Sequence, residues 1–363
     1  MLQPTPFCNL DCSYCYLPGR SRKAVMSDRV LEAIGRTILG GRLFDDETTV
    51  VWHAGEPCVL PPDWYVAATD RLERAGQRRI LRQSFQTNAT LIDDGWIDHF
   101  RRPGIGVGVS LDGPAAIHDR FRRTRSGGGT HARTMAGIDR LNRAGIPFHV
   151  IAVVSAAGME YPRDMARALV DTGARWIGLN VEEAEGENTT STLHAPDSLD
   201  RYRRFLDAFL DEVDRAPEPP LVRERERFLA SARMTGRPGP SRNQENTAGA
   251  IVSVGVGGAV STFSPELLGT TSTRYGSFDF GEIGAMSDLS DMFLHKAFLK
   301  AQRDIEIGNA ICRRTCAYFS VCGGGSPSNK LGEYGTFRVG RTQHCDHAIR
   351  ALYETLLDRT LVS

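Results

Sequence analysis

The stretch Cys8-Asn-Leu-Asp-Cys12-Ser-Tyr14-Cys15 supplies three thiolates in a C-x3-C-x2-C arrangement, with an aromatic residue before the last of them. A structural zinc site would need a fourth ligand to close its tetrahedron, and common ferredoxin runs use different spacings and fill every iron. The spacing therefore indicates a cubane iron–sulfur cluster in which one iron has no protein ligand and is open to chemistry. The alternative is three cysteines that lie close together in a loop by chance.

A second motif, Trp52-His-Ala-Gly-Glu-Pro57, follows directly after the β-branched run Thr48-Thr-Val-Val51. A strand that ends in Gly-Glu-Pro places backbone polar groups and a carboxylate at the C-terminal edge of a sheet. Open α/β folds and barrels build their sites at this edge. Alone, the motif would indicate only a turn, but here it follows the three cysteines by about forty residues.

Together, the cysteine spacing, the aromatic residue and the Gly-Glu-Pro turn resemble the signature of the radical S-adenosylmethionine (SAM) enzymes. In that family the open iron chelates SAM, and an electron from the cluster splits the cofactor into methionine and a 5′-deoxyadenosyl radical. The family begins the turn with two glycines, and Ala54 stands in place of the first. The resemblance implies a 4Fe–4S cluster on Cys8, Cys12 and Cys15, adenine packing on Tyr14, and binding of the SAM amino group by Ala54, Gly55, Glu56 and Pro57.

Length, charge and cysteine use narrow the class of protein. A chain of 363 residues can bury a sizeable core and favours two domains. Lys plus Arg balance Asp plus Glu at 44 each, so nothing argues for a nucleic acid or a membrane as partner. No apolar run approaches a transmembrane length, and no signal peptide is evident. Eight cysteines in such a chain indicate metal or catalysis rather than disulfides, and a cytoplasmic location.

Strand-like and helix-like segments alternate through the first two thirds of the chain, which is typical of a parallel sheet covered by helices. We expect strands near 2–5, 48–53, 79–86, 104–110, 147–154 and 175–181. We expect helices near 27–39, 62–75, 92–101, 131–144, 161–172 and 198–214. Six such units resemble the α/β fold of the family, a partial (β/α)6 barrel that is open on one side for a large substrate.

A second set of cysteines, with the spacing C-x3-C-x5-C-x22-C, lies near the other end: Cys312, Cys316, Cys322 and Cys345. Two compact C-x2-C knuckles would favour zinc, and these spacings do not offer them. The region resembles SPASM, a C-terminal extension that carries auxiliary 4Fe–4S clusters in peptide-modifying radical SAM enzymes. The full SPASM pattern has seven cysteines, and Ser261-Thr-Phe-Ser-Pro265 stands where one of them often lies. We therefore expect one auxiliary 4Fe–4S cluster on the four cysteines, with zinc or no shared metal as the alternatives.

The same comparison predicts how the chain is divided. A radical SAM core is expected over 1–215, and a connector over 216–249, beginning at Ala216-Pro-Glu-Pro-Pro220. A SPASM-like auxiliary cluster domain follows over 250–363 and starts with a β-hairpin. The eighth cysteine, Cys58, has apolar neighbours, and we assign it to packing.

Further polar residues are expected around the cofactor. The segment Ser110-Leu-Asp-Gly-Pro114, followed by His118-Asp-Arg-Phe-Arg122, matches a stretch of SPASM-type maturases. The resemblance implies that Ser110 binds the SAM ribose and that Arg122 approaches the methionine carboxylate, unless Arg122 forms a surface ion pair. Four side chains are candidates for a base or a substrate contact, and the sequence does not choose among them: His53, Asp112, Glu182 and Glu183. Two asparagines at strand ends are expected to line the mouth, or to act as caps or turns: Asn88 and Asn180.

Over its whole length the chain resembles the radical SAM/SPASM peptide maturases, and most closely the GRRM-type group, whose members and relatives form cyclophanes in ribosomally made peptides. The resemblance implies an oxidoreductase that joins a β-carbon of a precursor peptide to an aromatic ring, with an electron donor such as flavodoxin or ferredoxin. The narrower stretches that carry it are Cys12–Pro18, Leu179–Glu183, Phe263–Leu268 and Tyr318–Asn329. Thioether formation and formylglycine generation in a sulfatase are the nearer alternatives, and a non-enzymatic iron–sulfur carrier or sensor is the more distant one.

Overall fold

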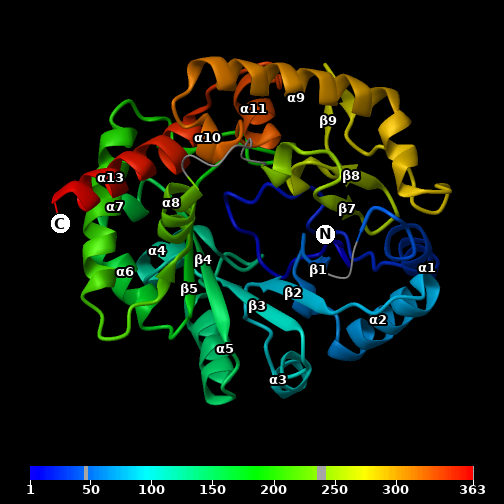
Figure 1. Ribbon diagram of the computed structural model, residues 1–363. Helices are drawn as coiled ribbons and strands as arrows, with labels where there is room; N and C mark the ends of the chain where they lie inside the picture. The colour runs from blue at the N-terminus through cyan, green and yellow to red at the C-terminus, as the bar shows by residue number, and fades with distance from the viewer. Residues whose placement is uncertain (45–47, 235–242, 363) are drawn as a thin grey trace.

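Six parallel strands form one curved sheet in the computed structural model, which describes residues 1–44, 48–234 and 243–362. Each strand pairs with the next along the chain, so every carboxyl end lies at the same edge of the sheet. This arrangement confirms the predicted α/β class (Figure 1). The strands are β1 (Thr49–Trp52), β2 (Arg82–Thr87), β3 (Ile105–Ser110), β4 (Phe148–Val154), β5 (Trp176–Val181) and β6 (Leu221–Val222).

Helices on the convex side of the sheet connect successive strands (Figure 1). Their starts follow local signals: Ser27 accepts a hydrogen bond from the Val30 amide at the first helix, and Pro62 opens the second. The helices of this part are α1 (Asp28–Ile34, continued as a π-helical turn over Gly35–Leu39), α2 (Pro62–Gly76), α3 (Asp94–Phe100), α4 (Ala115–Phe121), α5 (His131–Arg143), α6 (Pro162–Val170), α7 (Ser198–Asp214) and α8 (Arg223–Met234).

A cluster of large aromatic side chains fixes the first two strands against α2 and α3. The ring centroids of Trp52 and Tyr65 lie 5.2 Å apart, those of Tyr65 and Phe85 5.0 Å, and those of Phe85 and Trp96 5.7 Å. All four residues are buried, and each contributes about 2–3 kcal/mol of apolar burial. This packing holds the ends of β1 and β2, where the Gly-Glu-Pro turn and Asn88 follow.

One strand prediction was wrong, and one strand was missed. The range 2–5 forms no strand, because only Leu2 makes single bridges, to β1 and to the later hairpin. Pro4 and Pro6 have no amide hydrogen and cannot extend a ladder. The sixth strand is Leu221–Val222, which directly follows a proline-rich stretch and is too short to show a periodic pattern.

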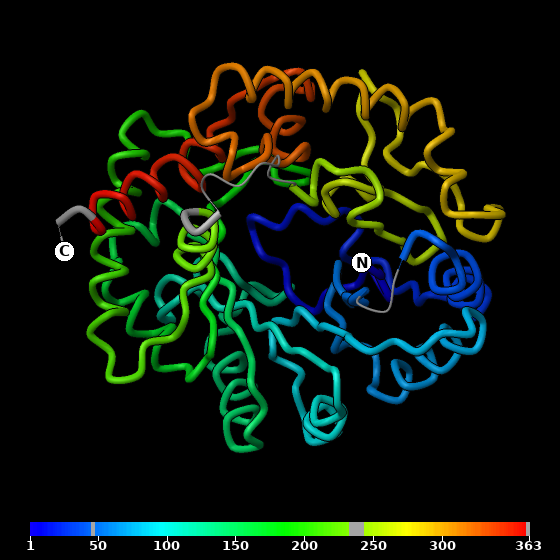
Figure 2. The backbone as a smooth tube through the Cα atoms, viewed as in Figure 1, coloured from blue at the N-terminus to red at the C-terminus, as the bar shows by residue number. Residues whose placement is uncertain are grey.

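The C-terminal part closes the molecule opposite the sheet, and the N-terminal loop lies between the two (Figure 2). Its last helix returns to the barrel, where Arg359 forms ion pairs with Asp207, Asp211 and Asp214 of α7. Its elements are the hairpin β7 (Val252–Val254) and β8 (Val260–Thr262), the short strands β9 (Thr271–Ser272) and β10 (Gly276–Ser277), and helices α9 (Lys296–Thr315), α10 (Phe319–Cys322), α11 (Pro327–Tyr334), α12 (Gln343–Cys345), a π-helical segment (Asp346–Ala351) and α13 (Leu352–Val362).

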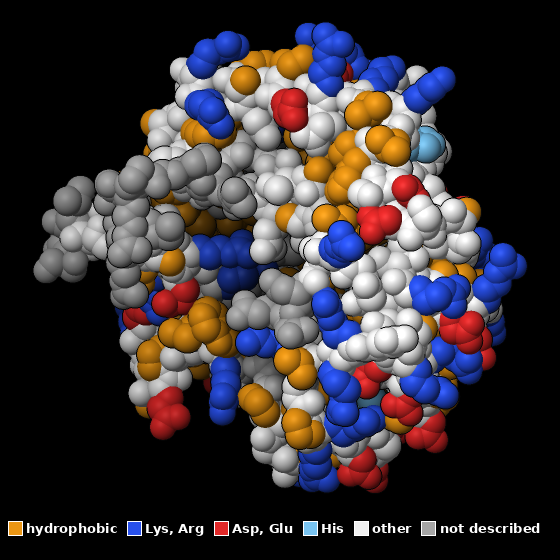
Figure 3. Space-filling view, turned by 45° about the vertical axis from the view of Figure 1, so that its right-hand side comes forward, with side chains coloured by type: hydrophobic (Ala, Val, Ile, Leu, Met, Phe, Trp, Pro, Cys, Tyr) orange, Lys and Arg blue, Asp and Glu red, His pale blue; other side chains and the backbone are white. Residues whose placement is uncertain are grey.

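The predicted connector, 216–249, contains β6 and α8, which pack on β5. Residues 235–242 of that range lie outside the described residues, and the division of the chain into domains stays a prediction. Basic and acidic side chains are interspersed over the lower part of the face in Figure 3. None of the helices in the described ranges is long and apolar enough to cross a membrane.

Candidate active site and second cysteine site

The first cysteine loop lies over the carboxyl edge of the sheet. The Glu56 amide donates to the Phe7 carbonyl at 2.9 Å, and Asn88 places its Nδ2 4.0 Å from the Cys8 sulfur. Burial raises the pKa of Cys8 to about 12 and that of Cys12 to about 11. Thiols in such surroundings become thiolates only beside strong positive charge, which iron supplies. The donor set and its setting therefore fit an iron–sulfur cluster.

The Gly-Glu-Pro turn has a backbone that only particular residues allow. Gly55 has φ +102°, and a Cβ there would lie 2.3 Å from the Thr5 carbonyl oxygen, so this position requires glycine. Ala54 adopts φ +68°, a left-handed conformation that is costly for a residue with a Cβ. The turn thus packs closely against the extended segment that leads into the cysteine loop.

The buried Glu56 carboxylate ties this turn to the end of β2. Its Oε1 accepts from the Cys58 amide at 2.9 Å and from the Thr87 hydroxyl at 2.6 Å, and its Oε2 accepts from the Asn88 amide at 2.8 Å. Burial raises the pKa of Glu56, while these three donors oppose the rise. A carboxylate offers about four acceptor positions, so one remains for a donor from a ligand.

Asp112 joins the cysteine loop to β3 and β4. Its carboxylate is buried and accepts from Arg122 Nε at 3.0 Å, from the Tyr14 hydroxyl, and from the Val153 amide at 3.0 Å. The Arg122 guanidinium also lies 5.5 Å from the centre of the Tyr14 ring. Arg122 therefore forms a buried ion pair rather than the surface pair considered from the sequence. Asp112 acts through its partners as a positioning residue.

The other predicted cofactor residues divide between two places. Ser110 Oγ accepts from Gln86 Nε2 at 3.0 Å at the carboxyl edge, and Asn88 Nδ2 donates to Asn9 Oδ1 of the cysteine loop at 2.9 Å. Asn180 instead accepts from Arg223 of α8 at 2.7 Å. The first two thus lie beside the loop, and Asn180 binds the helix that follows β6.

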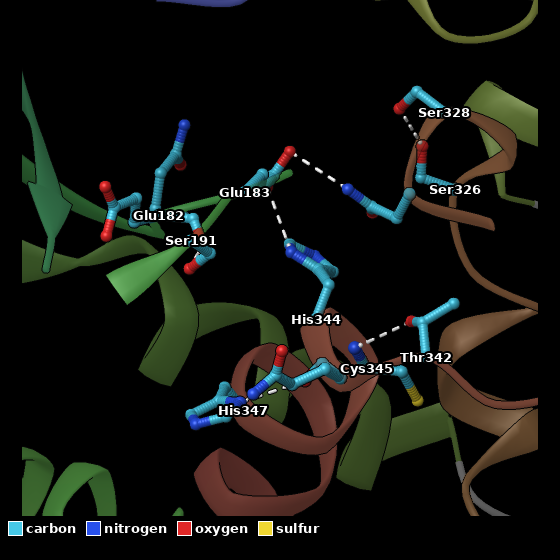
Figure 4. A network of polar contacts seen from close by, with 12 residues as sticks. Glu182, Glu183, Ser191, Ser326, Ser328, Thr342, His344, Cys345 and His347 are labelled. Carbon is cyan, nitrogen blue, oxygen red and sulfur yellow. Dashed lines mark hydrogen bonds and ion pairs between the residues drawn. The ribbon is translucent and has the colours of Figure 1, made fainter. Parts of the chain in front are cut away.

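A network of polar side chains joins the end of β5 to the C-terminal part, and Figure 4 shows Glu182, Glu183 and His344 within it. We call its acidic members, Glu182, Glu183, Glu185 and Glu266, the carboxylate network. Glu183 forms an ion pair with His344 Nδ1 at 3.0 Å and accepts from Asn329 Nδ2 at 3.0 Å. Burial alone would raise the pKa of Glu183, but His344 outweighs it and lowers the value to about 2. Burial raises the pKa of Glu266 to about 8 and that of Glu185 well above its usual range. The network therefore holds ionised and protonated carboxyl groups side by side.

The remaining candidate bases, His53 and Glu182, form hydrogen bonds with nearby residues. His53 Nε2 lies 3.1 Å from the Tyr16 hydroxyl, and burial lowers the pKa of His53 to about 4, so its ring is neutral. Glu182 accepts from the Thr192 amide at 2.9 Å. Tyr16 joins the cysteine loop to the chain that follows Glu185, because its carbonyl accepts from the Glu187 amide at 2.9 Å. The pKa of the Tyr16 hydroxyl is raised first by burial and then by Glu266 and other acidic groups nearby.

The second cysteine set comes from α9, from the residue that follows it, from α10 and from α12, and it joins one buried residue, Cys312, to three half-buried ones. Cys312 Sγ donates to the Gly340 carbonyl at 2.6 Å. Burial raises the pKa of Cys345 to about 12, and the other three cysteines raise it further. The amides of Gly324 and Gly325 donate to the Cys322 sulfur, as is common around iron–sulfur clusters.

Over the described ranges, no three His, Cys, Asp or Glu side chains are arranged to hold a single metal ion. A cubane carries its iron atoms at the corners of a cube, so its thiolates surround a volume rather than one point. The backbone after Cys322 can fold around such a volume, because Gly323, Gly324 and Gly325 all have positive φ. The donor set fits a cluster.

Comparisons with known proteins agree with this geometry. Residues 2–167 match the model of the radical SAM superfamily. An uncharacterized protein of Synechocystis is 37% identical over 366 residues, which cover 98% of this chain and 90% of the relative. The chain belongs to the radical SAM superfamily.

Other relatives of this radical SAM enzyme match only part of its sequence, and the solved structures that resemble it share its fold at low sequence identity. A serine-type anaerobic sulfatase-maturating enzyme of Bacteroides thetaiotaomicron is 34% identical over 176 residues, 47% of this chain and 42% of that enzyme. The chain thus matches less than half the length of that relative. The structure of anSMEcpe with bound AdoMet has a TM-score of 0.80 at 18% identity and covers 99% of this chain and 93% of its own. Streptococcus suis SuiB bound to its precursor peptide SuiA has a TM-score of 0.67 at 18% identity, covering 95% and 74%.

Four residues of this radical SAM enzyme were not singled out from the sequence. Glu185 is the third carboxylate of the run that starts at Glu182, and Glu266 follows a proline. His344 directly precedes a predicted cluster ligand, and that adjacency was a usable signal. Lys330, which directly follows a stretch quoted for the resemblance, is buried beside the second cysteine set.

Proposed function

We propose that this radical SAM enzyme crosslinks a ribosomally made precursor peptide by joining an aromatic ring to a nearby β-carbon, as the GRRM-type cyclophane-forming group does. The observation that carries the proposal is the carboxylate network between the two cysteine sets. Crosslinking removes two hydrogens from the peptide. After the first is taken as a hydrogen atom, the enzyme needs one group that accepts an electron and another that accepts a proton. Tyr16 connects the first set to the network, and His344 connects the network to Cys345.

The first set of residues would bind the cofactor. Cys8, Cys12 and Cys15 would hold the cluster, and Glu56 has one acceptor position left for the amino group of SAM. When bound, cluster and SAM supply a carbon-centred radical that removes a hydrogen atom from the peptide. Ser110 and Asn88 lie at the edge where the ribose is expected. Arg122 is held by Asp112 and reaches the same edge, so Asp112 sets its orientation for a carboxylate.

Among the four candidate bases, the contacts favour Glu183. Asp112 already accepts three hydrogen bonds, Glu182 binds Thr192, and His53 is buried against Tyr16. Glu183 is ionised at neutral pH and is paired with an imidazole. A ring that loses an electron after bond formation becomes strongly acidic, so a carboxylate of low pKa suffices to accept its proton. A cavity of about 10 Å³ beside Glu183 and His344 is near the size needed for one water.

The second set would take the electron. Four cysteines whose thiols interact with one another suit a fully ligated auxiliary 4Fe–4S cluster, which needs no open position to accept an electron. The first cluster would be reduced by a donor such as flavodoxin or ferredoxin, and we place the enzyme in the cytoplasm. A peptide as partner is supported by fold-level neighbours that bind peptides, SuiB with SuiA and anSMEcpe with the Cp18Cys peptide.

Formylglycine generation in a sulfatase is a second candidate. It is favoured by the 34% identity to a serine-type anaerobic sulfatase-maturating enzyme over 47% of the chain. The two reactions use the same cofactor and differ in product, so only the product distinguishes them. Thioether formation would leave a carbon–sulfur bond instead.

Mass spectrometry of the product tests the proposal. The short peptide encoded beside this gene is co-expressed with the enzyme, and Cys12→Ala serves as the control. We expect a mass lower by two hydrogens per modified motif, with fragmentation blocked between an aromatic residue and a near neighbour, and no change in the control. Formylglycine made from serine also loses two hydrogens, but it fragments normally and reacts with hydrazines. An unmodified peptide would contradict crosslinking of this partner.

A further inference from the structure

Lys330 is a buried lysine beside the second cysteine set. It is 3% exposed and lies on α11, whereas the other lysines of this chain, Lys23, Lys296 and Lys300, are exposed. The chain otherwise uses arginine for almost all of its basic side chains. A single lysine in the interior of an arginine-rich protein therefore needs a local reason.

The protein supplies few partners for this ammonium group. Its Nζ donates to Asn309 Oδ1 at 3.4 Å, a long hydrogen bond, and in the part of the chain that the structure describes no carboxylate forms an ion pair with it. An ammonium group in the interior loses its hydration, and this loss destabilises the charged form unless the group is paired. A Cβ at Gly325, in the turn that follows Cys322, would lie 4.0 Å from Lys330 Cε, so the side chain lies beside that turn. Burial lowers the pKa of the Lys330 ammonium group, and the thiols of Cys312, Cys322 and Cys345 oppose this shift.

The surrounding backbone leaves room for the charge. A Cβ at Gly308 of α9 would lie 3.2 Å from Lys330 Nζ and 2.1 Å from the Phe337 carbonyl oxygen. Glycine at this position thus lets the ammonium group approach the helix next to Asn309. A lysine suits the place better than an arginine, because its charge is compact and does not require a planar, two-pronged partner.

We propose that Lys330 raises the reduction potential of the auxiliary cluster and so makes it a better electron acceptor. This inference rests on the proposed function, which supplies the cluster and the electron. The cluster gains one negative charge when it accepts the electron that the crosslinked ring loses, while the ring proton goes to Glu183. A fixed positive charge beside the thiolates stabilises the more negative, reduced form more than the oxidised form.

The test is an anaerobic redox titration of the full-length protein with both clusters, followed by electron paramagnetic resonance. The auxiliary signal is identified as the one that persists when Cys8, Cys12 and Cys15 are all replaced by alanine. We expect Lys330→Met to move the auxiliary midpoint to a more negative potential, and Lys330→Arg to move it less. The exposed Lys296→Met is the matched control and should leave it unchanged. Peptide crosslinking should slow several-fold in Lys330→Met, while 5′-deoxyadenosine formation without peptide stays the same.

Several results would overturn the inference. An unchanged midpoint in Lys330→Met with full iron content would show that the charge does not act on the cluster. Loss of the auxiliary iron in both Lys330→Met and Lys330→Gln would assign the charge to holding the cluster rather than to tuning it. A wild-type content of about four rather than about eight iron atoms per chain would remove the auxiliary cluster and this inference together. The crosslinking proposal is tested separately by the mass of the peptide product. A failure of that proposal can therefore be distinguished from a failure of the Lys330 inference, which the redox titration tests.

Discussion

The two cysteine sets have similar thiols and different surroundings. Each set has one buried cysteine, Cys12 or Cys312, among half-buried ones, and burial raises the pKa of Cys8 and of Cys345 to about 12. The first set is anchored to strand ends by the carboxylates Glu56 and Asp112. The second lies among helices and a glycine turn, with the buried Lys330 nearby and with Asp346 and Arg341 close to Cys345. The contrast teaches that an open site depends on polar groups aimed at a ligand, whereas a closed site depends on balancing the charge of what it encloses.

Loss of a cysteine from the first set should have the largest effect. Cys12→Ala removes one of three predicted ligands, and two thiolates do not hold a cubane. We expect 5′-deoxyadenosine formation from SAM under reduction to fall below detection, and crosslinking with it. Chromatography of the nucleoside products measures this result. Cys58→Ala is the control, since Cys58 packs behind the turn. Normal 5′-deoxyadenosine formation by Cys12→Ala would show that the first cysteine set does not hold the cluster that cleaves SAM.

The matching change in the second set should separate SAM cleavage from product formation. Cys316→Ala removes one of four predicted auxiliary ligands and leaves the cysteine loop intact. We expect 5′-deoxyadenosine to form at a rate near that of the wild type, while crosslinked peptide falls at least tenfold. The ratio of the two products is the measurement, and circular dichroism checks that the chain is folded. Crosslinking at the normal rate would show that the second set is not the electron acceptor.

The buried ion pair of Asp112 and Arg122 beside the first cysteine set should contribute more to the free energy of unfolding than an exposed ion pair does. Asp112→Asn leaves the Arg122 charge buried without its partner, and removing one member of such a pair costs about 3–5 kcal/mol. We expect a corresponding drop in the urea midpoint under anaerobic conditions. Asp94→Asn breaks the exposed pair with Arg140, which lies at 2.7 Å, and should cost less than about 1 kcal/mol. Equal effects of the two changes would contradict the role given to Asp112.

The part of the site that could be predicted from the sequence is the part that is local in the chain. The three cysteines of the first loop lie within one short segment, and Asp112 and Arg122 belong to one matched stretch. Their identity as a group therefore needs no knowledge of packing. The strand order was predictable for the same reason, because consecutive strands pair with one another.

The contacts between distant segments were not predictable. Glu183 pairs with His344, which follows it by more than a third of the chain, and the pairing depends on how the C-terminal part closes on the barrel. The burial that makes Lys330 unusual is likewise a property of packing, not of its neighbours in sequence. The strand β6, which directly follows a proline-rich stretch, was missed because two residues cannot show a periodic pattern.

The network between the two sets should make stability depend on pH. The pKa of Glu266 is raised from 4.5 to about 8, so the folded protein binds a proton there that the unfolded chain has released. Its contribution to stability is present below pH 4.5 and is lost as the pH rises through 8. Glu266→Gln cannot ionise, and we expect it to gain at least about 1 kcal/mol relative to the wild type between pH 5 and pH 8. Urea unfolding at both pH values measures this, with the exposed Glu306→Gln as control; parallel curves for wild type and Glu266→Gln would contradict it.

The smallest expected effect concerns the turn that anchors the first set. Ala54 has φ +68°, where a Cβ costs roughly 1–2 kcal/mol and glycine costs much less. Ala54→Gly relieves this strain but adds freedom to the unfolded chain, which offsets up to about 1 kcal/mol. We therefore expect a net gain of about 0.5–1 kcal/mol by thermal or urea unfolding. Ala116→Gly, at an exposed position of α4, should instead lose about 1 kcal/mol. Opposite signs would confirm that the first set is held by a strained backbone turn, and a loss in both would mean that this turn is relaxed with alanine in place.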